Sequence, residues 1–419
     1  MIIDEDGAAQ RDGTPSGPGT PGSGTGPTVV LAPDSFKESM SAEEACAAME
    51  RGVTRAWPAA RCLWRPMADG GEGTVAAVLR GAAGARGVEV VAHDALARPR
   101  RAHLAWIPEA STALVEVAEG PGLEHVDADE RDIWGATSVG VGEMVLAALD
   151  LGVRRLVIGL GGSACNDAGA GMLEALGIRF LDDEERIVRT RGPRTLCGVR
   201  RIDVSGLDPR LAHTRMVAAS DVTSPLLGDA GASAVFGPQK GAGPEDVDLL
   251  DEVLSGLARL GAEACGKDLS GAPGAGAAGG IGWACQQFLG ARMRPGVEVV
   301  ADLVGLEEAV IDADLVLTGE GSVDAQTLTG KTPWGVARVA VGAGVPVVVI
   351  AGRVREGAEE LLARGVAAVV PMVRDAGIVD EGGSPALLGA GPGNLAAAAE
   401  MVCRLHALVP PLGAGGSGD

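Results

Sequence analysis

Basic residues are few in this sequence, and lysine is rarer still. The 35 lysines and arginines face 56 aspartates and glutamates, which gives a formal net charge of −21 and a pI of about 4.7. A chain this acidic repels phosphodiester backbones and anionic lipid, so nucleic acids and membrane surfaces are unfavourable partners. An anionic ligand would have to be held by a local group of cations, backbone amides or a metal ion.

The sequence also lacks paired cysteines, a basic leader and long apolar runs. Its seven cysteines are scattered and include no C-x-x-C pair, which favours free thiols in a reducing compartment over a zinc site or a disulfide framework. The acidic start, MIIDEDGAAQRDG, is unlike a secretory signal. Runs such as VPVVVIAG are too short to span a bilayer. We therefore expect a cytoplasmic protein, and the sequence leaves monomer and homodimer both open.

Tyrosine is absent, and only four of the basic residues are lysines, namely Lys37, Lys240, Lys267 and Lys331. This bias is typical of a GC-rich coding sequence, so each retained lysine is a candidate for a specific role. Lysine is a compact point charge and arginine a planar fork, so the two are not equivalent at a phosphate.

The apolar pattern predicts an α/β protein. A length of 419 residues favours two domains. Near-continuously apolar runs alternate with helical segments at both ends of the chain, at 28–32, 313–321 and 345–352. This arrangement is typical of a parallel sheet covered on both faces. The shorter, more alternating runs of residues 86–118 predict an antiparallel or mixed sheet.

We therefore predict a Rossmann-like parallel-sheet domain built from both chain ends, interrupted by a second, inserted α/β domain. The Rossmann-like domain takes residues 28–71 and 292–408, and the inserted domain takes residues 72–291. The ends of the chain, 1–27 and 409–419, are rich in small and turn-forming residues. Such composition predicts a disordered tail at the start and a flexible tail at the end.

Three loops that follow predicted strands of the terminal domain carry most of the candidate chemistry. Ligands bind at the carboxyl ends of the strands in an open parallel sheet. These loops contribute carboxylates, glycines and two of the four lysines. Their candidate residues are Asp34, Ser35 and Lys37 in the first loop, Asp69, Gly70, Gly71 and Glu72 in the second, and Gly319, Glu320, Asp324, Gln326, Thr327 and Lys331 in the third.

These residue types suit phosphoryl transfer when they occur together. Glycines let backbone N–H groups approach phosphate oxygens, and helix N-termini favour negative charge. Carboxylates bind Mg²⁺ or accept the proton of the attacking hydroxyl. Asp34 or Asp69 alone could equally be a turn or capping residue.

The inserted domain adds further candidates after its own strands. They lie in one glycine-rich loop between a strand and a helix, in one loop after a later strand, and in one glycine-flanked turn. The residues are Gly161, Gly162, Ser163, Asn166 and Asp167, then Asp221, and finally Lys240.

Two other motifs are incomplete matches. Residues 159–164, GLGGSA, fit the dinucleotide pattern G-x-G-x-x-G/A after a strand, so an NAD-dependent oxidoreductase remains an alternative. Against this alternative, the negative charge of Asp167 at the start of the next helix would repel a pyrophosphate. Residues 330–332 mimic the end of a Walker A loop, but Ala325 stands where its first glycine belongs.

The motifs APDSFK, ADGGEGT, GGSACNDAGAGML, DVTSPLLG, FGPQKGA, GAAGG, TGEG and GKTP follow one another in the sequence. In this order they closely resemble the glycerate kinase type I family, from about residue 29 to residue 407. The resemblance implies ATP-dependent phosphorylation of D-glycerate to 2-phosphoglycerate, dependence on Mg²⁺, and a Rossmann-like domain interrupted by an inserted one. Glycerate is then the small-molecule substrate and ATP with Mg²⁺ the cofactor.

For the mechanism we hypothesise that Lys37 and Lys331 neutralise phosphate charge. Glu320 and Asp324 are the candidate Mg²⁺ ligands, and Asp324 is also a candidate catalytic residue. Asp69 is our choice for the base, because it ends a strand and precedes a glycine-rich helix start.

On the acceptor side, we expect Lys240 and the loop of Ser163, Asn166 and Asp167 to hold the glycerate from the inserted domain, across a cleft between the domains.

Three positions depart from the family pattern. Glu38 replaces the glycine of FKGS, Cys165 replaces the threonine of SATND, and Ser322 replaces the arginine of GEGRxD. Glu38 adds negative charge beside a phosphate loop, and Ser322 removes a cation. A catalytically inactive sensor of glycerate or nucleotide is therefore a further alternative.

Overall fold

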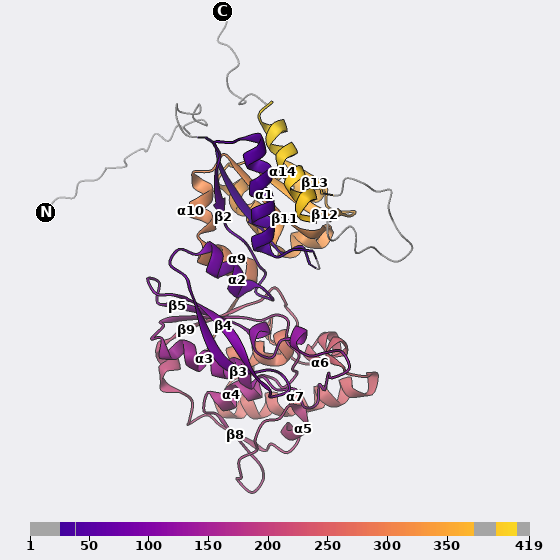
Figure 1. The fold of residues 1–419 in the computed structure, drawn as a ribbon. Coiled ribbons are helices and arrows are strands. Elements are labelled where there is room, and N and C mark those ends of the chain that lie inside the picture. The colour runs from indigo at the N-terminus through magenta and orange to yellow at the C-terminus, as the bar shows by residue number, and fades with distance from the viewer. Residues whose placement is uncertain (1–25, 38, 373–390, 409–419) are drawn as a thin grey trace, which may run out of the picture.

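The computed structural model describes residues 26–37, 39–372 and 391–408, which form two lobes (Figure 1). One lobe contains a five-stranded sheet made from the two ends of the chain, and we call it the terminal lobe. The other contains a six-stranded sheet from the middle of the chain, and we call it the inserted lobe. The predicted fold class is confirmed. Apart from residues 26 and 27, the expected tails lie outside the described residues.

The sheet of the terminal lobe has the strand order β13-β12-β11-β1-β2, and every pair is parallel. Its strands are β1 (Thr28–Pro33), β2 (Arg61–Trp64), β11 (Leu315–Val323), β12 (Val347–Val354) and β13 (Ala368–Pro371). Apolar residues fill the middle of the sheet on both faces, because helices cover both sides.

Helices α1 (Ala42–Ala56) and α14 (Gly391–His406) pack side by side over one face of this sheet (Figure 1). The opposite face carries α10 (Leu306–Ile311), α11 (Thr332–Gly342) and α12 (Glu360–Ala363). Segments from the two ends of the chain therefore build one lobe.

The sheet of the inserted lobe is mixed, as the alternating runs predict. Its strand order is β10-β9-β6-β5-β4-β3, antiparallel among β3, β4 and β5 and parallel from β5 to β10. The strands are β3 (Arg86–His93), β4 (Pro99–Ile107), β5 (Thr112–Glu116), β6 (Arg155–Gly159), β9 (Arg215–Ala219) and β10 (Arg292–Arg294). Strand β10 thus belongs to this sheet, although the expected domain boundary at 292 would assign it to the terminal domain.

Helices and a small ribbon surround the inserted sheet. The helices are α3 (Val139–Asp150), α4 (Ala170–Ala175), α5 (Pro193–Leu196), α6 (Ala232–Phe236), α7 (Pro244–Cys265) and α8 (Ile281–Gln287), and the ribbon pairs β7 (Arg179–Leu181) with β8 (Arg201–Asp203). Among the residues that the structure describes, no helix combines the length and the apolar character needed to cross a membrane.

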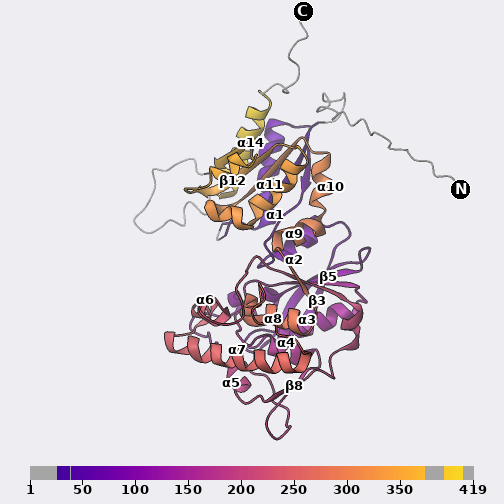
Figure 2. The ribbon, with the colours of Figure 1, turned by 180° about the vertical axis from the view of Figure 1, so that it is seen from behind.

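Two helices, α2 (Thr74–Gly81) and α9 (Gly296–Val304), lie between the two sheets (Figure 2). Val78 of α2 and Val300 of α9 belong to one buried cluster that also contains Val30 of the terminal sheet and Val157 of the inserted sheet. A single apolar core therefore crosses the junction of the lobes, and burial of this core favours their association.

The packing of the two chain ends can be tested at Gly52 of α1. A Cβ atom there would lie 2.0 Å from the carbonyl oxygen of Ala396 in α14. We expect Gly52→Ala to lower the melting temperature, since overpacking costs about 1–3 kcal/mol. Gly256 of α7 is the matched control, because a Cβ atom there meets nothing within 4 Å. Gly256→Ala should raise the melting temperature slightly, through better helix propensity. Equal effects of the two substitutions would contradict this account of the α1–α14 contact.

Candidate active site

Asp34 follows β1 at the carboxyl edge of the terminal sheet. Its N–H group donates to the carbonyl oxygen of Gly319, at 2.9 Å, and its Oδ2 atom accepts from the hydroxyl of Thr332, at 2.5 Å. Burial, together with the nearby charge of Asp69, raises the pKa of Asp34 to about 6. The side chain is thus fixed between two loops of the sheet and the first turn of α11.

Asp221 brings a third carboxylate to the same region, from the end of β9 in the inserted lobe. Its Oδ1 atom accepts from the N–H of Gly296 at 2.9 Å, at the N-terminus of α9. Burial raises the pKa of Asp221 to about 6, with smaller contributions from the charges of Asp69 and Asp34. Three carboxylates from two lobes therefore repel one another here, and a bound cation would relieve this repulsion.

The donor set fits a metal ion that is shared with a phosphate ligand. Mg²⁺ is usually held by one or two carboxylates together with substrate phosphates and water, rather than by a cage of protein side chains. In the described parts of the chain, no three His, Cys, Asp or Glu side chains are arranged to hold a metal ion by themselves. The neighbouring carboxylates of Asp34, Asp69 and Asp221 suit a site in which carboxylates hold the ion together with phosphate oxygens and water.

The loop that carries Asp69 is pressed against the inserted lobe. A Cβ atom at Gly161 would lie 2.4 Å from the Cα of Gly71, and one at Gly296 would lie 1.7 Å from the carbonyl oxygen of Asp69. Gly70 has a φ of +90°, in the left-handed region that favours glycine. Asp69 itself accepts from the N–H of Gly71 through Oδ1, at 3.0 Å. Glycines are needed here because backbone meets backbone directly.

Glu116, at the end of β5, is a residue of this region that the sequence analysis missed. It is only 2% exposed, and its two carboxylate oxygens accept from the N–H of Gly73, at 3.0 Å, and of Val75, at 2.8 Å. Burial raises its pKa to about 8. Glu116 therefore holds the N-terminus of α2 against the inserted sheet. The signal that could have found it is a lone acid within the apolar run ALVEVA.

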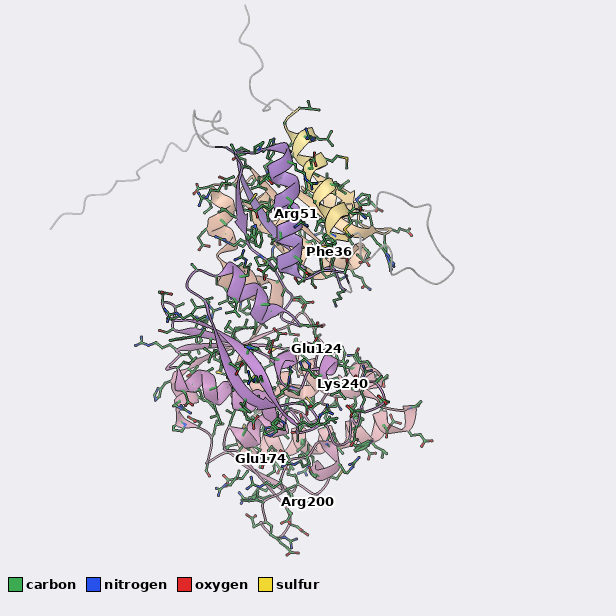
Figure 3. All side chains as sticks on the ribbon, viewed as in Figure 1. Phe36, Arg51, Glu124, Glu174, Arg200 and Lys240 are labelled. Atoms are coloured by element: carbon green, nitrogen blue, oxygen red, sulfur yellow. The ribbon has the colours of Figure 1, made fainter. Side chains whose placement is uncertain are left out.

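Glu72 lies on the surface, near the carboxyl of Glu124 in the short 3₁₀ helix η2 (Leu123–His125). Burial, together with the neighbouring carboxyl of Glu72, raises the pKa of Glu124 to about 7. Figure 3 shows Glu124 at the edge of the inserted lobe that faces the terminal lobe.

The third loop of the terminal sheet joins Glu320 to the start of α11. The hydroxyl of Thr327 donates to Oε1 of Glu320 at 3.2 Å, and Asp324 accepts from the N–H of Gln326 at 2.9 Å. Burial raises the pKa of Glu320 to about 7, and the nearby positive charge of Lys331 opposes this shift. The expected metal ligands are therefore Glu320, near the end of β11, and Asp324, directly after this strand, on the segment that leads to Lys331.

The turn after β1 contributes an exposed lysine, Lys37, and the backbone N–H of Ser35, which donates to Oδ1 of Asp34 at 2.6 Å. The glycine at 319 is required by packing, because a Cβ atom there would lie 1.9 Å from the carbonyl oxygen of Ile350. Glu38, one of the departures from the family pattern, lies outside the described residues.

The lysine of the inserted lobe is buried rather than exposed. Lys240 is 2% exposed and donates to the hydroxyl of Ser163, at 2.8 Å, and to the carbonyl oxygen of Cys165, at 2.7 Å. Figure 3 labels Lys240 within the inserted lobe. Burial lowers its pKa to about 8. Its ammonium group thus fixes the conformation of the loop that precedes α4.

Asn166 and Asp167 are also buried and bonded within the inserted lobe. The side-chain amide of Asn166 donates to the hydroxyl of Ser233 at 3.0 Å. Asp167 accepts from the N–H and the hydroxyl of Ser138, at 2.8 and 2.9 Å, and from the N–H groups of Gly169 and Gly171. Asp167 therefore ties the starts of α3 and α4 together.

The same loop offers free backbone donors. The N–H groups of Gly161, Gly162 and Ser163 make no hydrogen bond to any described residue. The N–H groups of the residues directly before and after them do donate hydrogen bonds to backbone carbonyl oxygens. Gly162 has a φ of +64°, and successive N–H groups around a left-handed residue form a concave nest for anions. The loop can therefore receive a carboxylate or a phosphate through its backbone.

Comparison with known proteins gives the family of the chain. The family described as "Glycerate kinase family" matches residues 29–407. The chain belongs to the glycerate kinase family. It is accordingly a kinase, and this assignment favours phosphoryl transfer over the oxidoreductase alternative.

Relatives resemble the chain over most of its length. It is 44% identical over 345 residues to "Glycerate kinase" of Bacillus subtilis, covering 82% of this chain and 90% of that one. It is 42% identical over 357 residues to "Glycerate 2-kinase" of Escherichia coli, covering 84% and 92%. A crystal structure of a provisionally named glycerate kinase 2 from Salmonella typhimurium LT2 superimposes with a TM-score of 0.80 at 42% identity, covering 91% of this chain and 98% of that one.

Glu116 offers a test of how the site is held. In Glu116→Gln, one of the two N–H groups at the start of α2 would face an amide donor instead of an acceptor. Leaving a buried donor unpaired costs about 1–3 kcal/mol, so we expect a lower melting temperature and a lower kcat. The exposed Glu109 provides the control, and Glu109→Gln should change neither quantity. Wild-type stability and turnover in Glu116→Gln would show that this carboxylate does not position the loop.

Proposed function

We propose that the chain transfers the γ-phosphate of MgATP to D-glycerate and produces 2-phosphoglycerate where the loops of the two lobes meet. The observation that carries this proposal is that loops of both lobes meet at Gly296, which donates to Asp221 and packs against the carbonyl oxygen of Asp69. Asp34, from a third loop, lies near enough for the charge of Asp69 to act on it. The names of the Bacillus subtilis and Escherichia coli relatives support glycerate as the acceptor, and the second name supports its 2-hydroxyl group.

In this proposal the terminal lobe binds the nucleotide. Lys37 and Lys331 neutralise phosphate charge, and the N-terminus of α11 adds a favourable dipole. Mg²⁺ would be held by phosphate oxygens together with carboxylates, for which Asp34 and Asp221 are candidates beside Glu320 and Asp324. The ion would supply charge neutralisation at the transferring phosphoryl group.

The inserted lobe binds the acceptor. The free N–H groups of Gly161, Gly162 and Ser163 support a site for the carboxylate of glycerate. Lys240 keeps this loop in place through its bonds to Ser163 and Cys165. This arrangement would place the hydroxyl groups of the acceptor towards Asp69.

Asp69 is then the base that accepts the proton of the attacking hydroxyl. It lies on a loop fixed by both lobes, and its charge acts on Asp34 and on Asp221. Positioning of the hydroxyl and of the phosphate is the larger part of catalysis in phosphoryl transfer.

The product of the reaction tests the proposal as a whole. With MgATP and D-glycerate, we expect ADP and a product whose phosphorus resonance couples to the single proton on C2 in NMR spectra. L-glycerate and a sample without acceptor should give little ADP. A product phosphorylated at C3 would overturn the regiochemistry, and no transfer by a protein that still binds MgATP would favour the sensor alternative.

Replacing Asp69 tests the base. In Asp69→Asn the side-chain oxygen can still accept from the N–H of Gly71, so the loop should keep its shape. Loss of a general base typically costs 10²–10⁴-fold in rate, and we expect roughly this fall in kcat. Asp129→Asn, at an exposed position of the inserted lobe, is the control. An Asp69→Asn enzyme with near-normal kcat would remove Asp69 from this role.

A further inference from the structure

Strands β11 and β12 extend beyond the core of the terminal sheet and carry an exposed arginine at their carboxyl edge. Ser322 of β11 and Arg353 of β12 are Cα partners in the parallel register, two residues beyond the pair of Glu320 and Ala351. Side chains alternate between the faces of a sheet, so Ser322 and Arg353 project on the same face as Glu320. This is the face on which Lys331 lies near the carboxylate of Glu320.

Ser322 brings no charge to this face. Its hydroxyl oxygen is buried and has no hydrogen-bond partner within the described residues. Neighbouring strands run about 4.8 Å apart, and a Cβ atom at Gly352 would lie 2.5 Å from the carbonyl oxygen of Gly321. The two strands are therefore tightly apposed here, and a long side chain at 353 can cover the space beside the short one at 322.

Arg353 is exposed, and its guanidinium forms no hydrogen bond or ion pair with any described residue. Many other arginines of the chain are engaged by acids, for example Arg294 by Asp302 and Arg338 by Glu298. In a chain with a net charge of −21, a guanidinium that no described acid engages is available for an anionic ligand. Guanidinium binds phosphate oxygens through two parallel N–H bonds.

We propose that Arg353 supplies a phosphate-binding cation of the nucleotide site, taking over from the next strand the charge that Ser322 lacks. The ligand is the triphosphate of MgATP, because β11 and β12 belong to the terminal lobe with Lys37 and Lys331. The buried hydroxyl oxygen of Ser322 can accept one N–H of the guanidinium and leave its other donors for phosphate. This inference rests on the proposed function for the identity of the nucleotide.

The test measures MgATP binding directly, by calorimetry without glycerate, and then the two KM values in an ADP-release assay. A charge-assisted bond to phosphate predicts that Arg353→Ala weakens MgATP binding roughly 10- to 100-fold. The KM for MgATP should rise in parallel, and the KM for D-glycerate should change by less than about twofold. Arg355→Ala, two residues further along the same exposed segment, is the matched control and should bind MgATP as the wild type does.

A double variant that moves the positive charge from β12 to β11 gives a second test of the proposal. In the double variant Ser322→Arg with Arg353→Ser the cation returns to β11, and we expect MgATP affinity within about threefold of the wild type. Wild-type affinity in Arg353→Ala, or an equal loss in Arg355→Ala, would overturn the proposal. A rise confined to the KM for glycerate would also overturn it. If Arg353→Ala proves unstable, affinity intermediate between wild type and MgATP-free background in Arg353→Lys supports the role, and unchanged affinity refutes it.

Failure of this inference can be distinguished from failure of the proposed function. If the wild type transfers no phosphate to glycerate and Arg353→Ala still loses MgATP affinity, the arginine keeps its role and the acceptor is wrong. If the wild type phosphorylates glycerate and Arg353→Ala binds MgATP normally, the kinase assignment stands and the role of Arg353 is wrong.

Discussion

The direct contact of backbone with backbone at residues 69–71 is the constraint on which the site depends. Asp69 and Gly71 lie so close to Gly296 and Gly161 that a side chain on either of these glycines would collide with main-chain atoms. Glu116 reinforces the junction by accepting two N–H groups at the start of α2. Because the loop is held from both sides, the position of Asp69 is fixed relative to the carboxylates of the terminal lobe and of the inserted lobe.

Charge is the second determinant of the site. The chain is strongly acidic, and several of its carboxylates lie where an anionic nucleotide is proposed to bind. Burial and mutual repulsion raise the pKa values of Asp34 and Asp221 to about 6, and burial raises that of Glu320 to about 7. These shifts mean that the ionised groups carry an energetic cost in the ligand-free protein. A divalent cation that arrives with phosphate would relieve the cost, which links nucleotide binding to the association of the two lobes.

The sequence was sufficient to predict the fold class and the position of Asp34 directly after β1, because both follow from local patterns. The expectation that Asp69 ends a strand is wrong, because β2 ends at Trp64 and Asp69 lies in the loop that follows. Continuous apolar runs mark buried parallel strands, and ligands collect at the carboxyl ends of such strands. Features that depend on distant contacts could not be read in this way. The bonds of Glu116 to α2 join residues more than forty positions apart, and Lys240 reaches a loop that precedes it by 75 residues or more. Likewise, β10 is only three residues long, and nothing in its sequence indicates pairing with β9.

The central claim is that loops of both lobes form one site, and hydrogen–deuterium exchange tests it most directly. Backbone exchange would be followed peptide by peptide in the free protein, with MgATP, and with MgATP plus D-glycerate. The account predicts that MgATP slows exchange in 331–335, and that adding D-glycerate slows it in 69–73 and 161–163 together. Slowing confined to one lobe, or unchanged exchange in 161–163, would contradict a site shared between the lobes.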